Sequence, residues 1–178
     1  MTMPMSGRTL ILVRHAKAEK GMSKPDHARE LAPRGRKDAY AVGEWLSSDL
    51  QPGVLLDMVL CSTSARTRQT LDEVCAGGAT FRETRFDDRI YDGSAVGIIE
   101  LLHEVPDTVH TVLVIGHAPG IPVLATVLAQ DGAGSTDAAE HLNQGFPTSG
   151  LAVLGFDGSW AALAPDTAYL QEFVVPRG

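Results

Sequence analysis

The stretch TLILVRHAKAEK, which runs from Thr9 to Lys20, begins with a short apolar segment and continues into charged residues. The segment Leu10–Val13 has the length and the continuous apolar character of a strand that is covered on both faces of a parallel sheet. Arg14 and His15 follow it directly, a cation beside an imidazole. A buried strand that ends in this way is a rigid support for chemistry at its carboxyl end.

Two further segments repeat this arrangement. The apolar strand predicted over residues 55–62 leads into Ser62 and Arg66, and the apolar strand predicted over residues 110–117 ends in His117. In α/β sheets, ligands bind beyond the carboxyl ends of the strands. We therefore expect the two arginines and the two histidines to meet at one edge of a sheet.

Helical patterns separate these strands. Apolar residues recur at helical spacing in four segments, which we predict as helices: residues 33–50, 64–77, 94–106 and 120–130. Ser62 and Ser64 are the candidates for the N-cap of the second helix. An edge strand is predicted over residues 80–89, a loop with a short helical piece over 131–148, and closing strands over 149–158 and 169–176. This alternation predicts an α/β fold, a three-layer sandwich with a mostly parallel central sheet flanked by helices.

The size and composition fit one enzyme-sized domain. The chain has 178 residues, and we assign residues 9–178 to a single domain that follows a disordered tail at residues 1–8. A net charge of −7 argues against a general nucleic-acid binder. Cys61 and Cys75 are too few for a disulfide framework, so we expect both to be reduced. No segment is long and apolar enough for a signal peptide or a membrane span, and we expect a cytoplasmic monomer that does not bind membranes.

The predicted cluster of arginines and histidines suits a phosphoryl group. The planar guanidinium group pairs well with phosphate, and the N-terminus of the helix after Ser62 can add backbone N–H donors. Neither a Walker A motif nor an HExxH motif occurs, so we predict no P-loop nucleotide site, no metal and no cofactor. A neutral imidazole nitrogen can attack phosphorus and form a phosphohistidine, and nearby arginines favour the neutral form by lowering its pKa.

Three motifs together, LVRHAKAE, CSTSARTRQT and VLVIGHAPG, resemble those of the histidine phosphatase superfamily, which has the phosphoglycerate-mutase-like fold. The resemblance extends from about residue 9 to residue 175. It implies that Arg14, His15, Arg66 and His117 form the catalytic tetrad of the superfamily. It also implies that His15 is the nucleophile that accepts the phosphoryl group.

Within this superfamily the chain resembles the compact SixA-like phosphohistidine phosphatases. The chain is short, with no room for a large lid insertion before His117, and two segments match that branch: DHARELAPRG (residues 26–35) and FPTSGLAVLGF (residues 146–156). The chain departs from the common pattern in having Ala16 where glycine is usual and Thr63 where proline is common. We do not expect either difference to disable the site.

Further site residues are predicted with alternatives. Arg29 is assigned as a phosphate contact rather than an ordinary loop charge, and Ser62 as a helix cap that also contacts phosphate. Members of the superfamily that cleave esters usually bring a carboxylic acid to the site, and the candidates here are Asp26 and Asp92. The alternative for Asp26 is a partner of Arg29 or a surface residue, and Asp92 also fits a turn before Gly93.

The resemblance implies a phosphatase that removes phosphate from phosphohistidine on a protein, such as a phosphorelay or sugar-transport carrier. Because an imidazole leaving group titrates near pH 6.5, it departs without a strong acid. Two alternatives stay open. The first is a phosphatase of small phosphate esters, such as sugar phosphates or nucleotides, and the second is a non-catalytic module that binds phosphorylated proteins.

Overall fold

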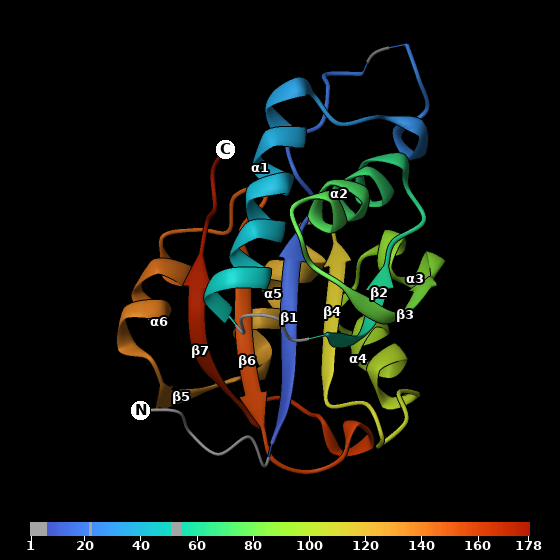
Figure 1. Ribbon diagram of the computed structural model, residues 1–178. Helices are drawn as coiled ribbons and strands as arrows, with labels where there is room; N and C mark the ends of the chain where they lie inside the picture. Colours follow the sequence, from blue (N-terminus) through green and yellow to red (C-terminus); the bar gives the residue numbers. More distant parts are fainter. Residues whose placement is uncertain (1–6, 22, 51–54) are drawn as a thin grey trace.

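The computed structural model describes residues 7–21, 23–50 and 55–178. A seven-stranded sheet runs through it in the order β3-β2-β4-β1-β6-β7-β5 (Figure 1). The strands are β1 (Arg8–Arg14), β2 (Leu56–Cys61), β3 (Phe81–Phe86), β4 (Thr111–Gly116), β5 (Ala129–Gly134), β6 (Leu151–Phe156) and β7 (Ala168–Val174). All pairings are parallel except those of β6, which is antiparallel to β1 and β7. The predicted α/β class with a mostly parallel sheet is confirmed.

Helices cover both faces of this sheet. They are α1 (Pro33–Trp45), α2 (Ala65–Ala76), α3 (Asp88–Asp92), α4 (Ala95–His103), α5 (Gly120–Leu128) and α6 (Thr136–Asn143). Figure 1 shows α1 and α2 in front of the sheet and α3, α4 and α5 behind it. A π-helical turn, Leu46–Leu50, follows α1, and short 3-10 turns lie at Asp26–Ala28 and Trp160–Ala162.

The apolar run of β1 packs in two directions. Leu10 and Leu12 belong to the core that α4 and α5 complete, and Ile11 and Val13 belong to the core that α1 and α2 complete. All four side chains are fully buried. Because both faces of the strand are covered, its sequence is continuously apolar instead of alternating. The structure is therefore the three-layer sandwich that the sequence predicts.

Several element boundaries differ slightly from the predicted ones. Strand β1 begins at Arg8, whose guanidinium donates to Asp107, whereas the predicted tail included this residue. The remainder of the predicted tail, apart from residue 7, lies outside the described residues. The N-cap of α2 is Ser64, whose hydroxyl accepts from the backbone N–H of Thr67, so Ser62 does not cap this helix.

Two short elements at the margins of the sheet were not predicted. Strand β5 occupies residues that we expected to be the end of a helix and the start of a loop, and it pairs with β7 only at Ala129 and Gly134. Helix α3 lies within and just after the predicted edge strand. The short helical piece predicted within residues 131–148 is α6, and both predicted closing strands are present as β6 and β7.

The register of the three central strands gathers their carboxyl ends. Arg14 pairs with Gly116 across β1 and β4, and Cys61 pairs with Ile115 across β2 and β4. The strands are parallel and adjacent, so the residues that follow them meet at one edge of the sheet. This edge lies at the top of Figure 1.

Candidate active site

A cavity of about 470 Å³ lies at this edge of the sheet. The described residues that line it are Arg14, His15, Lys17, Ala18, Lys20, Asp26, Arg29, Arg66, His117, Ala118 and Thr148. All four residues of the predicted tetrad are therefore brought together, although they come from three separate parts of the sequence. Arg29 and Asp26 join them from the segment between β1 and α1.

His15 is held as a neutral imidazole with a fixed tautomer. Its Nδ1 lies 2.8 Å from the carbonyl oxygen of Ala16, and because a carbonyl only accepts, Nδ1 carries the proton. Its Nε2 is then unprotonated and lies 3.3 Å from the Nε donor of Arg66. Burial, together with the nearby charges of Arg66, Arg14 and Arg29, lowers the pKa of His15 to about 4, although the hydrogen bond to Ala16 opposes this shift. At neutral pH the Nε2 lone pair is available for attack on phosphorus.

His117 lies against His15, with 5.2 Å between the ring centroids. Its Nδ1 is 3.2 Å from Nη2 of Arg66, which can only donate, so Nδ1 accepts and Nε2 carries the proton. Nε2 in turn lies 2.7 Å from the hydroxyl oxygen of Ser62. Burial and the neighbouring His15 and Arg66 lower the pKa of His117 to about 3. Both imidazoles are therefore neutral at pH 7.

The two arginines are anchored differently. Arg66, in the first turn of α2, is 5% exposed and donates through Nη1 to the backbone carbonyl of Asp26 at 2.8 Å. Arg14, the last residue of β1, donates through Nη1 to the carbonyl of Phe146 at 2.8 Å. Burial lowers the pKa of Arg14. These anchors aim two fixed cations at the cavity, where they can balance charge on phosphoryl oxygens.

The carboxylate of Asp26 is held in its ionised form. Its Oδ2 accepts from the Tyr91 hydroxyl at 2.9 Å and from Arg66 at 3.1 Å, and its Oδ1 accepts from Arg29 at 3.1 Å. The hydrogen bond from Tyr91, followed by those from Arg66 and the charge of Arg29, lowers the pKa of Asp26. This carboxylate orients the two arginines, and it is a poor proton donor near neutral pH.

Two sequence predictions about the site need correction. Ser62 is fully buried and does not line the cavity; its hydroxyl bonds to His117, so it supports an imidazole instead of contacting phosphate. Asp92, the last residue of α3, is not among the lining residues either. Of the two candidate acids, only Asp26 lines the cavity. In α3 it is Tyr91 that contacts Asp26, whereas Asp92 is the last residue of the helix.

Sequence reasoning missed Tyr91, which lies close to both His117 and the exposed His27. The Tyr91 ring packs edge-on against His27, at 4.8 Å between centroids, and against His117, at 5.5 Å. His27 also lies 2.9 Å from the hydroxyl of Thr63. Tyr91 belongs to α3, the helix that the sequence pattern did not reveal, so no signal connected it to the motifs.

Comparison with known proteins identifies the family of the chain. The model of the histidine phosphatase superfamily (branch 1) matches residues 10–107. The chain belongs to the histidine phosphatase superfamily. An uncharacterised protein of Mycobacterium tuberculosis is 42% identical over 165 residues, which cover 93% of this chain and all of that protein.

Two relatives lie in the SixA-like branch of the superfamily. A solved structure from Nakamurella multipartitia, described as a candidate phosphohistidine phosphatase SixA, aligns with a TM-score of 0.81 and 38% identity, covering 96% of this chain and 97% of that one. A phosphohistidine phosphatase SixA homolog of Haemophilus influenzae is 31% identical over 118 residues, 62% of this chain and 70% of that protein. These matches confirm the SixA-like assignment, and the aligned structures confirm the phosphoglycerate-mutase-like fold.

The described residues of this histidine phosphatase meet the requirements of neither a metal site nor a membrane-spanning helix. They contain no group of three or more His, Cys, Asp or Glu side chains that could hold a metal ion. Among the same residues, no helix combines the length and the apolar character needed to cross a membrane.

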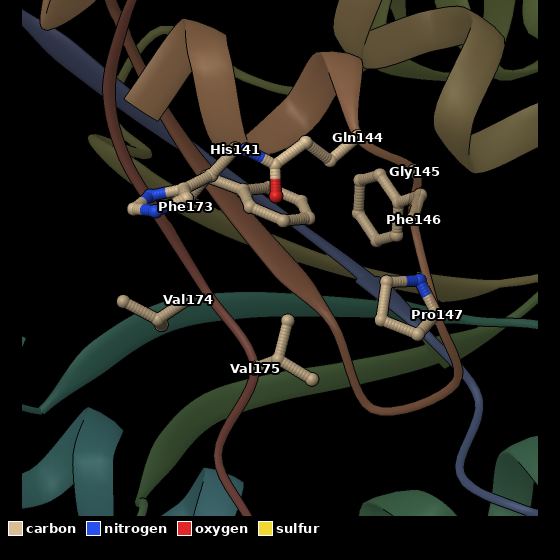
Figure 2. A pocket seen from close by; sticks show the side chains of 8 residues that line it. All are labelled: His141, Gln144, Gly145, Phe146, Pro147, Phe173, Val174 and Val175. Carbon is tan, nitrogen blue, oxygen red and sulfur yellow. The ribbon is translucent and has the colours of Figure 1, made fainter. Parts of the chain in front are cut away.

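A larger cavity, of about 680 Å³, lies beside the active site but has a different character. Figure 2 shows its lining, which comes from the end of α6, the following loop and the end of β7: His141, Gln144, Gly145, Phe146, Pro147, Phe173, Val174 and Val175. It holds no cationic cluster, so it does not suit a phosphoryl group. The carbonyl of Phe146 links it to the predicted tetrad, since it accepts from Arg14.

Proposed function

We propose that this protein is a phosphatase that removes the phosphoryl group from phosphohistidine on another protein, such as a phosphorelay or sugar-transport carrier. The observation that carries the proposal is the pairing of a neutral, correctly protonated His15 with a site whose one described carboxylate, Asp26, is held ionised. Such a site supplies a nucleophile and positive charge, but no carboxylic acid.

The first step is attack by Nε2 of His15 on phosphorus. A bond forms between Nε2 and phosphorus, and the bond from phosphorus to the substrate nitrogen breaks. Arg14 and Arg66 balance the negative charge of the phosphoryl oxygens during this displacement. The proton stays on Nδ1, and its hydrogen bond to the Ala16 carbonyl stabilises the ring as positive charge develops on it.

The leaving group explains why an acid is dispensable. An alcohol leaves poorly unless a group in the site protonates it, whereas an imidazole takes a proton from solvent on its other nitrogen near pH 6.5 and departs neutral. In the second step, water attacks phospho-His15, the bond from Nε2 to phosphorus breaks, and inorganic phosphate leaves. His15 returns to its neutral form.

The relatives support the same substrate class. The Haemophilus influenzae protein carries the name of a phosphohistidine phosphatase, and the Nakamurella multipartitia structure, similar over nearly the whole chain, carries the same name as a candidate. The cavity also fits a substrate presented on a surface, since Asp26 and Lys17 at its rim are exposed.

Turnover of two substrate classes tests the proposal. A histidine-phosphorylated carrier protein and a panel of small phosphate esters are incubated with the enzyme in the presence of a metal chelator. The wild type is expected to remove phosphate from the carrier faster than from any ester. The His15→Ala variant is expected to be inactive. The His110→Ala variant is expected to keep full activity, because it changes an exposed histidine that precedes β4, at the opposite end of that strand from His117.

The other outcomes are equally informative. Ester turnover without phosphohistidine turnover would keep the chemistry of His15 but replace the protein substrate by a small molecule. Binding of the phosphorylated carrier with no turnover and no phosphoenzyme would contradict catalysis and favour a phosphate-binding module.

A further inference from the structure

The active-site cavity carries more positive charge than a phosphoryl group requires. Five cationic side chains line it against the single carboxylate of Asp26, a formal charge of +4 when both imidazoles are neutral. A bound phosphoryl group brings about −2 at pH 7. A formal charge of about +2 then remains, within a protein whose net charge is −7.

The positive charge that remains after phosphate binding is assigned to Lys17 and Lys20. Arg29 and Arg66 are both paired with Asp26, as described above. Neither lysine forms an ion pair or a side-chain hydrogen bond with any residue in the part of the chain that the structure describes, and both are exposed. They follow His15 closely in the sequence and line the same cavity, so their charge is available to a substrate bound there.

The rest of the lining restricts what the substrate can be. Beyond the charged groups and the imidazoles, the described wall consists of Ala18, Ala118 and Thr148. Apart from the two imidazoles, the described lining residues include no Phe, Tyr or Trp side chain on which a nucleobase could stack. The wall is therefore suited to small polar groups with negative charge.

We propose that Lys17 and Lys20 form a subsite for a second anionic group of the substrate, next to the phosphoryl group at His15. The inference rests on the proposed function, in which this second group is an acidic side chain close to the phosphohistidine of the substrate protein. Lysine suits the task because its ammonium group is a compact charge on a flexible stem, which can follow a carboxylate on a moving partner.

Two peptides test this subsite. Both carry one phosphohistidine, and they differ only in having glutamate or glutamine beside it. The wild type is expected to hydrolyse the glutamate peptide with the higher kcat/KM. Because exposed ion pairs are weak, the Lys17→Gln and Lys20→Gln changes should each lower this kcat/KM by roughly two- to fivefold more than the kcat/KM for the glutamine peptide.

A control variant and a charge reversal sharpen the test. Lys37→Gln removes an exposed lysine from α1, outside the cavity lining, and is expected to change neither rate. The double change of Lys17 and Lys20 to glutamate should reverse the preference, favouring a third peptide with lysine beside the phosphohistidine. Equal losses on the glutamate and glutamine peptides, or no loss on either, would overturn the subsite.

A binding measurement separates the subsite from the proposed function. Ethyl phosphate and phosphoglycolate differ by one carboxylate, and their dissociation constants are measured by calorimetry on His15→Ala, which cannot form a phosphoenzyme. Tighter binding of phosphoglycolate, lost when Lys17 and Lys20 become glutamine, supports the subsite even if no phosphohistidine peptide is hydrolysed. Equal affinity for the two esters, or no binding of either, contradicts it.

Discussion

Asp26 shows how much the role of a carboxylate depends on its partners. Three donors, from Tyr91, Arg66 and Arg29, converge on its two oxygens and favour the ionised form. A group in this state positions the arginines but does not protonate a leaving group. We therefore interpret Asp26 as a residue that positions Arg66 and Arg29.

The Asp26→Asn variant tests this role. Because the aspartate is exposed and its ion pairs are weak, we expect kcat/KM to fall by roughly two- to fivefold. The fall should be the same for phosphohistidine and for any ester that the enzyme hydrolyses, since no proton transfer is lost. Rates are measured on both substrates, with Asp92→Asn as a control that should change neither. A much larger fall on the ester would identify Asp26 as a general acid.

The convergence of the tetrad could be predicted because its members stand at the end of a strand, directly after one, or in the first turn of the helix that follows one. Their position in space then follows from the parallel register alone. Ser62 and Asp92 could not be placed in this way, because their roles depend on the direction of a side chain. The hydroxyl of Ser62 bonds to His117, and nothing in the sequence indicates that direction of the side chain. Tyr91 reaches Asp26 across 65 positions of sequence, from a helix that has only 5 residues.

At the scale of elements, glycines hold α2 close to α1 and so help to set the position of Arg66. A Cβ atom on Gly43 would lie 2.0 Å from the backbone oxygen of Val74, and one on Gly77 would lie 2.2 Å from that of Tyr40. The two helices therefore approach each other backbone to backbone, and the contact leaves no room for a side chain.

Replacing Gly43 by alanine is expected to force the helices apart. Overpacking of this kind costs roughly 1–3 kcal/mol of unfolding free energy, and the shift of α2 should also reduce kcat/KM. Urea denaturation and turnover measure the two effects. Gly97→Ala in α4 is the control, since its Cβ would meet only the hydroxyl of Ser94 within 3.4 Å. An unchanged free energy of unfolding for Gly43→Ala would show that the contact adjusts freely.

The central strands could be predicted because strands that are buried on both faces have long apolar runs in the sequence. Strand β5 and helix α3, at the margins of the sheet, could not be predicted because their sequences contain no such run. Strand β5, with the sequence AQDGAG, has no β-branched or aromatic residue, and it is held by only two paired positions with β7. Helix α3 is too short for a helical period to be recognised.

At the scale of the whole molecule, an acidic protein concentrates cations and neutral imidazoles at one edge of its sheet. The edge is assembled by the same packing that buries β1, so the site shares in the stability of the fold. His15 illustrates the consequence: it is 8% exposed and is kept uncharged by burial beside arginines. Folding therefore opposes the protonation of this residue.

Because folding opposes the protonation of His15, the free energy of unfolding should fall as the pH falls. The pKa of His15 is about 4 in the folded protein and about 6.5 when unfolded, so below pH 6.5 the unfolded chain binds more protons. The contribution of the neutral His15 to the free energy of unfolding is fully present above pH 6.5 and is lost as the pH falls toward 4.

Between pH 7.5 and pH 5, the free energy of unfolding of the wild type should fall by about 2 kcal/mol more than that of His15→Gln. Urea denaturation at both pH values measures this difference, with His110→Gln as the matched control. Parallel losses in the wild type and His15→Gln would mean that His15 is already solvated, and the neutral nucleophile would then have to be created by the substrate.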